Sequence, residues 1–345
     1  MTFARAGAYN SHVRRALLFA MMVVAGAARA SADPVVLQTG SAPVVNVVLR
    51  SGDVAFKTWN RNAVQVEGAG AQANYLPDRF LAGRIPESIP AWSQTVQTVR
   101  GEATLPAETW VLPQLTAGSH DGVAVRGDGD TTVTVPVGTA LIIARVNGRS
   151  GIALQDYRGT FFFIARAGRI DLRGAGGTAF LQTVRGAISV ADSSFDRVRA
   201  RNAIGPIVFS QCTAGQIEVS SVFGNVVYDD GKFSPGLARF ESDRGDVAVG
   251  VSGGAQIGAH SSGGHIATEF AGRASVSSRG VDTRAVVGAG GPVVSASSGT
   301  GNVLLYDGSL RAHAALGRRS PALRRLFERG APLRAGTGAR RPRRV

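Results

Sequence analysis

The acidic residues of one segment are the first candidates for catalysis. Asp229 and Asp230 are adjacent, and Glu241, Asp243 and Asp246 follow soon after. A glycosidase needs two carboxyls that face the same bond. Adjacent residues of a strand point to opposite faces, and Asp-Asp-Gly is common in turns. We therefore expect no catalytic residue here. A polysaccharide-acting enzyme, the alternative, would require acids from neighbouring repeats to converge on one face.

Other residue types with chemical potential are sparse. His260, His265 and Glu269 suggest a metal site, but the flexible "SSGG" between the histidines and the small ligand number argue against one. Cys212 is the only cysteine, so no internal disulfide can form, and we expect it to be a small buried strand residue. The glycine clusters "RGAGG" and "GAGGP" lack the helix that a dinucleotide site requires. No cofactor and no metal are expected.

Arg-Gly-Asp, a tripeptide recognised by many adhesion receptors, occurs twice, at 126–128 and 244–246. The second copy belongs to a repeated phrase. Gly-x-apolar-x-apolar recurs as "GRIDL", "GAISV", "GPIVF", "GNVVY", "GDVAV" and "GHIAT", with starts 18 to 21 residues apart, and again as "GNVLL" from Gly301. Gly245 is thus predicted to begin a strand, and Asp246 to occupy a variable outward position. Both tripeptides are interpreted as turns.

The phrase predicts a repeat architecture. Period-two alternation indicates a strand with one buried face, and glycine supplies the turn before it. A second short strand, such as "GQIEVSS", lies between successive phrases. Stacked repeats bury a continuous apolar column, so we predict an all-β solenoid of about eight coils, with a degenerate copy near 280. A β-sandwich is the alternative.

The solenoid hypothesis specifies two interior ladders. The first contains Ile170, Ile188, Ile207, Val226, Val247 and Ile266. The second contains Leu172, Val190, Phe209, Tyr228, Val249 and Thr268.

The two ends of the chain carry its positive charge. The formal charge is +14, yet residues 33–310 contain equal numbers of basic and acidic residues. In residues 1–32, Arg14 and Arg15 precede the apolar run "ALLFAMMVVAGAA" and the small residues of "ARASA", which is the pattern of a cleaved secretory signal. We expect export to the periplasm, the cell surface or the medium, without a transmembrane segment after cleavage.

The remaining segments complete the predicted organisation. Residues 33–120 are expected to form a first β-unit and an irregular Pro-containing cap, in which Trp92 and Trp110 cover apolar surface. Residues 121–310 form the solenoid, and residues 311–345 an Arg-rich tail. "SPALRRLFERG" predicts a short helix, with Ser320 as its N-cap. The rest of the tail is too rich in Gly, Pro and Arg to pack.

The tail is the strongest electrostatic feature. Its arginines could bind phosphate-rich or other anionic polymers such as lipopolysaccharide. No aromatic residues alternate with them, so sequence-specific nucleic-acid recognition is not expected. The candidate binding residues are Arg318, Arg319, Arg324, Arg325, Arg340, Arg341, Arg343 and Arg344.

Two segments, "VVNVVLRSGDVAFKTWNRNAVQVEG" and "GQIEVSSVFGNVVYDDGKFSPGLARFESDRGDVAVGV", resemble the bacterial putative-adhesin domain family of unknown function, which consists of exported β-repeat proteins. The resemblance covers residues 42–69 and 121–308. It implies a non-enzymatic scaffold of the cell envelope or surface that binds a polysaccharide, lipopolysaccharide or protein through its outer faces. It supplies no catalytic residues.

Overall fold

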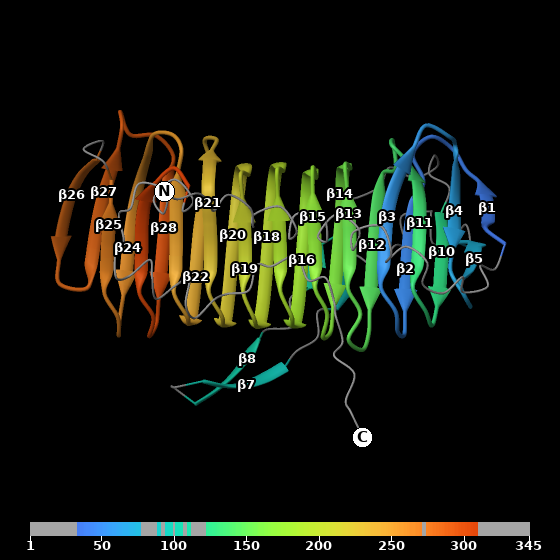
Figure 1. Cartoon of the computed structure of the whole chain (residues 1–345), viewed down its shortest axis with the longest axis horizontal. Helices are drawn as coiled ribbons and strands as arrows, with labels where there is room; N and C mark the ends of the chain where they lie inside the picture. Colours follow the sequence, from blue (N-terminus) through green and yellow to red (C-terminus); the bar gives the residue numbers. More distant parts are fainter. Residues whose placement is uncertain are drawn as a thin grey trace, which may run out of the picture.

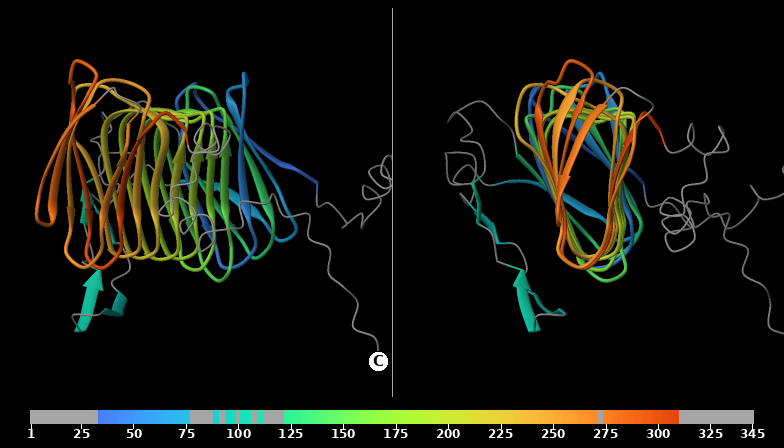
Figure 2. Two further views of the ribbon diagram at one scale, coloured as in Figure 1. Left: turned by 60° about the vertical axis from the view of Figure 1, so that its left-hand side comes forward. Right: turned by 90° about the vertical axis from the view of Figure 1, so that its left-hand side faces the viewer.

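The computed structural model describes residues 33–76, 88–90, 94–98, 101–105, 109–111, 122–270 and 274–309. All regular elements in these ranges are strands, and none of these residues forms a helix that could cross a bilayer. One large, mostly parallel sheet curves through 343° round an axis. Figure 2 shows the result from the end, a flattened ring, and Figure 1 shows the rings stacked side by side. The solenoid prediction is confirmed at this level.

Each ring has two long sides, here named sheet A and sheet B. In spatial order, sheet A contains β1 (Val35–Gln38), β4 (Ala63–Glu67), β11 (Thr131–Pro136), β3 (Val54–Trp59), β13 (Ile152–Gln155), β15 (Ile170–Arg173), β17 (Ile188–Ala191), β19 (Ile207–Ser210), β21 (Val226–Phe233), β23 (Val247–Val251), β29 (Val303–Asp307) and β25 (Ile266–Glu269).

Sheet B contains β5 (Gln72–Tyr75), β10 (Gly122–Gly127), β2 (Val44–Leu49), β12 (Leu141–Val146), β14 (Arg158–Ala165), β16 (Gly176–Arg185), β18 (Ser194–Ile204), β20 (Thr213–Phe223), β22 (Ala238–Arg244), β28 (Val293–Ser298), β24 (Ala255–Ser261), β27 (Asp282–Val287) and β26 (Ala274–Arg279). Two separate pairs join β6 (Ser88–Pro90) to β9 (Thr109–Val111) and β7 (Gln94–Thr98) to β8 (Gly101–Leu105).

One strand of each sheet makes a coil, and the described residues form ten: β10–β11, β2–β3, β12–β13, β14–β15, β16–β17, β18–β19, β20–β21, β22–β23, β28–β29 and β24–β25. This spatial order departs from the sequence at both ends. The coil of residues 44–59 lies between those of 122–136 and 141–155. The coil of residues 293–307 lies between those of 238–251 and 255–269.

The interior ladders are confirmed over five successive coils. Ile170 pairs with Ile188, then Ile207, Val226 and Val247 follow in register. All of them are at most 1% exposed, so the ladder is fully buried. The prediction is wrong at the last step, because Val303 lies between Val247 and Ile266.

The second ladder behaves in the same way. It runs in register from Leu172 to Val249, and Leu305 then separates Val249 from Thr268. Thr268 is exposed, because its strand is the last of sheet A. The expected coil near 280 is also wrong: β27 pairs antiparallel with β24 and β26. The hairpin of β27 and β26 pairs with the free edge of β24 in place of a further coil, and β26 becomes the new edge of sheet B.

Sheet A strands begin at glycines that stack on one another. A Cβ added to Gly205 would lie 1.9 Å from the carbonyl oxygen of Gly186, and one added to Gly224 would lie 1.9 Å from that of Gly205. The same overlap recurs at Gly168, Gly186, Gly245, Gly301 and Gly264. The coils therefore approach so closely at this glycine corner that no side chain fits.

Buried polar side chains complete the glycine corner. The residue three positions before each glycine donates a hydrogen bond to the corner carbonyl of the adjacent coil. These bonds are Thr183 to Gly168 (3.2 Å), Asn202 to Gly186 (2.7 Å), Ser221 to Gly205 (3.3 Å), Ser242 to Gly224 (2.8 Å), Ser298 to Gly245 (2.8 Å) and Ser261 to Gly301 (2.9 Å). All six donors are at most 5% exposed, so each would be costly to leave unpaired.

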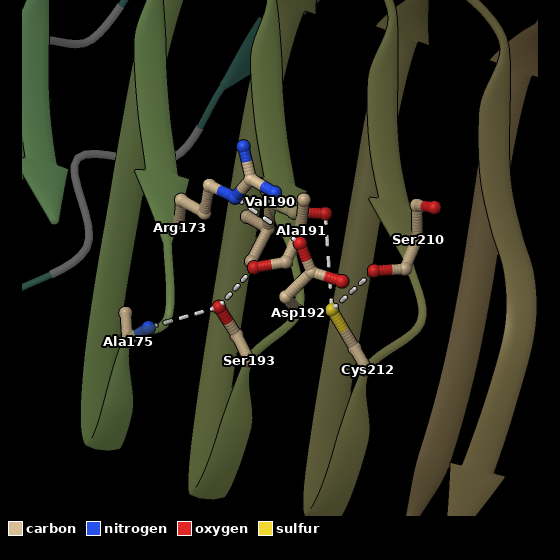
Figure 3. A network of polar contacts seen from close by, with 8 residues as sticks. All are labelled: Arg173, Ala175, Val190, Ala191, Asp192, Ser193, Ser210 and Cys212. Carbon is tan, nitrogen blue, oxygen red and sulfur yellow. Dashed lines mark hydrogen bonds and ion pairs between the residues drawn. The ribbon is translucent and has the colours of Figure 1, made fainter. Parts of the chain in front are cut away.

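The opposite turn, from sheet A back to sheet B, uses a left-handed residue in five successive coils. Asp156, Asp192, Gln211 and Asp230 have φ between 51° and 54°, and Gly174 has φ of 63°. The residue that follows points inward. Figure 3 shows two of these, Ser193 and Cys212, whose side chains bond to carbonyls of the turn: Ser193 Oγ to Ala191 at 2.7 Å, and Cys212 Sγ to Ser210 at 3.3 Å.

Candidate functional site

The described residues line a shallow groove on the outer face of sheet A. Two adjoining hollows, of about 570 Å³ and 350 Å³, share Ala55, Ala153, Arg169 and Asp171. The floor is a cross-strand row in register: Thr132, Ala55, Ala153, Asp171 and Ser189. Their neighbours along each strand point into the core, so these side chains point outward. Small side chains at successive positions make a channel that crosses the strands.

Charged side chains form the two walls of the groove. Asp53, Asp130, Arg149 and Arg169 line one side, and Lys57, Gln155 and Arg173 the other. Several of these groups are already held in place. Asp53 Oδ1 accepts from the Gly151 backbone N–H at 2.6 Å, and Asp130 Oδ1 accepts from the Asp53 N–H at 3.0 Å.

Asp171 differs from the other floor residues because it carries charge. Its Oδ2 pairs with Arg169 Nε, whereas its Oδ1 is buried and has no hydrogen-bond partner among the described residues. Burial raises the pKa of the Asp171 carboxyl, against the opposing effect of the Arg169 guanidinium.

The structure does not bring the acidic candidates together. Asp229 Oδ1 accepts from the buried Tyr306 hydroxyl at 2.9 Å on sheet A. Asp230 occupies a left-handed turn, where it accepts from Ser252 Oγ. Glu241 pairs with Arg239 on sheet B at 2.6 Å. These carboxylates therefore have structural partners on different sides of the ring.

The histidine candidates are also separated. His260 lies on β24 in sheet B. His265 precedes β25, and its backbone N–H donates to Asn302 Oδ1 at 3.1 Å. No group of three metal-ligating side chains occurs in the described ranges. The surroundings of His260 could not be predicted from the sequence.

His260 lies between a carboxylate and a hydroxyl. Its Nδ1 is 2.8 Å from Asp282 Oδ1, and its Nε2 is 3.0 Å from Ser262 Oγ. This is the order of groups in a catalytic triad. The side chains of His260 and Asp282 are 46% and 68% exposed, so water reaches the whole arrangement. It also joins β24 to β27, since His260 and Asp282 are cross-strand partners.

The second Arg-Gly-Asp tripeptide is part of the glycine corner. The Arg244 guanidinium lies over the Phe223 ring at 4.9 Å. Asp246 Oδ1 accepts from both the backbone N–H (2.8 Å) and the side-chain N–H (3.1 Å) of Asn302. Asn225 in turn accepts from the Asp246 N–H at 3.0 Å. The aspartate therefore links neighbouring coils, which supports its interpretation as a turn residue.

The first tripeptide closes a turn at the other end of the stack. Gly127 accepts at its carbonyl from the Arg50 N–H at 3.0 Å, and Asp128 accepts at its carbonyl from Ser51 Oγ at 3.1 Å. Cys212, as expected, is buried at 2% exposed, and burial raises the pKa of its thiol to about 11.

Several sequence-derived candidates lie outside the described residues. They are the signal segment 1–32, Trp92, the C-terminal helix around Ser320 and the arginines of the tail. Trp110 lies on β9, whose side chains are not described.

The groove and the buried polar side chains of the glycine corner were not predicted from the sequence. For the polar side chains, however, the sequence contains a signal. Thr, Asn or Ser stands three residues before each glycine of the phrase from Gly186 onward. The groove had no comparable signal, because Ala55 and Ala153 are far apart in the sequence and meet only through the inserted coil.

Comparison with known proteins gives distant structural similarities only. No family model matches the chain, and no curated protein matches it. A solved structure named "putative lipid binding protein", from Parabacteroides distasonis, is similar with a TM-score of 0.38 and 10% identity over 80% of this chain and 96% of that one. A "putative cell adhesion protein" from Clostridium sporogenes gives a TM-score of 0.18 and 8% identity, over 80% and 98%. Similarities of this size define neither a family nor an activity.

Proposed function

We propose that this chain is an exported, non-enzymatic scaffold of the bacterial envelope or surface, and that it binds an extended polysaccharide along the groove of sheet A. The groove is the observation that carries the proposal. It crosses the strands, so it follows the solenoid axis, and successive floor residues are spaced by about 4.8 Å. A linear polymer can lie along such a row and meet one coil after another.

The wall chemistry favours a hydroxyl-rich polymer. Carboxylates at Asp53 and Asp130 accept hydrogen bonds, and guanidiniums at Arg149, Arg169 and Arg173 donate them. Sugar hydroxyls can do both. The partly exposed Asp171 side chain adds a carboxylate to the floor itself. The secretory pattern of residues 1–32 supports a location where surface polysaccharides occur.

Binding can be tested with a variant that fills the groove. Ala153 is exposed in the floor, and Ala153→Tyr should block it without affecting the core. Ala124→Tyr, on the outer face of sheet B, is the matched control. Affinity electrophoresis through gels that contain dextran, alginate or lipopolysaccharide would measure retention. We expect at least one polymer to retard the wild type and Ala124→Tyr but not Ala153→Tyr. Equal retardation of all three proteins would contradict the proposal.

The Arg-rich tail provides the alternative mode of binding. Deletion of residues 311–345 should leave groove binding to a neutral polymer unchanged. If retention is confined to anionic polymers, falls with salt and disappears with this deletion, the tail is the binding element and the groove is not.

A second candidate function rests on the geometry around His260. Ser262 Oγ would attack an ester carbonyl while His260 Nε2 accepts its proton. The imidazolium, stabilised by Asp282, would then protonate the departing alcohol, and water would release the acid by the same route. Hydrolysis of p-nitrophenyl acetate tests this. Loss of turnover in Ser262→Ala but not in the exposed Ser295→Ala supports an esterase, and equal rates in both variants exclude it.

A further inference from the structure

Sheet B ends in an unusually accessible strand. β26 pairs with β27 on one side, and among the described residues it has no hydrogen-bonded neighbour on the other. Five of its six residues are exposed. Figure 1 shows β26 as the outermost strand at one end of the stack. Its outer edge therefore presents a row of backbone N–H and C=O groups that a further strand could pair with.

Within the described part of the chain, β26 lacks the features that usually prevent such pairing. Natural edge strands are protected by proline, by charged residues, by bulges or by a covering segment. The sequence of β26, "ASVSSR", contains no proline, and its one charged residue, Arg279, stands at the end. Val276 is 42% exposed in the middle of the strand, and Val281 is 48% exposed just beyond it.

At the other end of the stack, the edge strands of the two sheets are connected to each other. There the edge strands β1 and β5 contact each other. The Tyr75 hydroxyl donates to the Gln38 carbonyl at 2.8 Å and so connects the two strands. One carbonyl of the edge at that end is therefore bonded within the chain, whereas no such bond connects β26 to another edge strand among the described residues.

We propose that β26 pairs antiparallel with β26 of a second copy and forms a twofold dimer. An antiparallel pair of identical strands is self-complementary, which is the requirement of a twofold interface. In a register centred between Val276 and Ser277, these two residues lie opposite each other across the interface, and Arg279 lies opposite Ala274. Like charges do not meet. This inference goes beyond the proposed function: the dimer would hold two sheet A grooves, and binding of one polymer by both would increase avidity.

Light scattering with the full chain tests the dimer directly. We expect the wild type to have twice the monomer mass, and Val276→Lys to raise the dissociation constant at least about tenfold, because an edge lysine opposes strand pairing. Val293→Lys is the matched control: Val293 is 63% exposed but lies on β28, inside the stack. It should remain dimeric. Circular dichroism confirms the fold of each variant. A wild type that is monomeric at all concentrations overturns the proposal.

Disulfide trapping identifies the partner strand. Cys212 is buried, so Val276→Cys and Ser277→Cys each add one accessible thiol. Under mild oxidation, a covalent dimer is expected either from the mixture of the two variants or from one of them alone, depending on the register. Val293→Cys should give none. A cross-link formed instead with Asn74→Cys on β5 would overturn the twofold dimer in favour of head-to-tail assembly.

Discussion

Each coil contains two turns between sheet A and sheet B, and the two turns differ in the residue types that they contain. The glycine corner uses glycine in seven successive coils: Gly168, Gly186, Gly205, Gly224, Gly245, Gly301 and Gly264. The left-handed turn opposite accepts Asp, Gly, Asp, Gln and Asp. Both reverse the chain direction, yet only one requires a particular residue.

The difference shows that the contact between coils requires glycine even where the backbone angle does not. Gly224 has no φ in the left-handed region, but a Cβ there would lie 1.9 Å from the Gly205 carbonyl oxygen. A left-handed residue costs about 1–2 kcal/mol, which a polar side chain can partly offset with local hydrogen bonds. Overlap with the backbone of a neighbouring coil can be relieved only if the coil itself moves.

The largest effect is expected from Gly205→Ala. The added Cβ collides with the Gly186 carbonyl, and alanine is also strained at the Gly205 φ of 131°, so the free energy of unfolding should fall by about 3–5 kcal/mol. Gly280→Ala is the control, since Gly280 has a positive φ of 63° but no atom within 4 Å of an added Cβ. It should cost about 1 kcal/mol. Urea titrations measure both. Equal losses would mean that backbone strain, rather than the contact, determines the glycines.

A smaller change in stability is expected at high pH from Cys212, which directly follows the left-handed residue Gln211. Burial raises the pKa of its thiol from 9.0 to about 11, so the folded chain keeps a proton that the unfolded chain loses near pH 9. The resulting stability is complete below pH 9 and is lost as the pH rises through 11, a change of roughly 2–3 kcal/mol. The difference in unfolding free energy between wild type and Cys212→Ala, measured from pH 8 to 11, should follow this course. A constant difference would contradict it.

The hydrogen bonds from the buried polar side chains of the glycine corner should contribute somewhat less to the free energy of unfolding. Asn202→Ala leaves the Gly186 carbonyl without its side-chain donor and should lower the unfolding free energy by about 1–3 kcal/mol. Asn202→Ser should recover part of this loss, since serine occupies the equivalent position in neighbouring coils. If alanine and serine are equally destabilising, the hydrogen bond is not the cause.

The smallest effect is expected at the left-handed turn itself. Gln211 has φ of 54°, and Gln211→Gly removes its strain while adding entropy to the unfolded chain. The two contributions oppose each other, so the unfolding free energy should change by less than about 1 kcal/mol. A loss comparable to that of Gly205→Ala would show that this turn also depends on a specific side chain.

Sequence patterns predicted the central coils well. The spacing from Gly168 to Gly245 identified which apolar residues stack, because each coil there follows the previous one directly. The same reasoning failed at Ile266, where Val303 intervenes, and near 280, where β27 runs antiparallel. Periodicity reports that segments are similar, and similar segments can exchange places in a stack without any change in the pattern.

The candidate site shows most clearly that the sequence pattern does not give the spatial order of the coils. Asp246 and the acidic residues around it were correctly interpreted as turn or surface residues from their local sequence alone. The groove was not predicted, since Ala55 becomes a neighbour of Ala153 only when the first coil is inserted between later ones.

The sequence by itself determined the strand positions and the inward faces, because both depend on the size and polarity of side chains within one repeat. The tertiary structure alone decided the order of coils at both ends, the groove of sheet A and the open edge at β26. These depend on which strand lies beside which, and backbone hydrogen bonds can join any two strands whose shapes match.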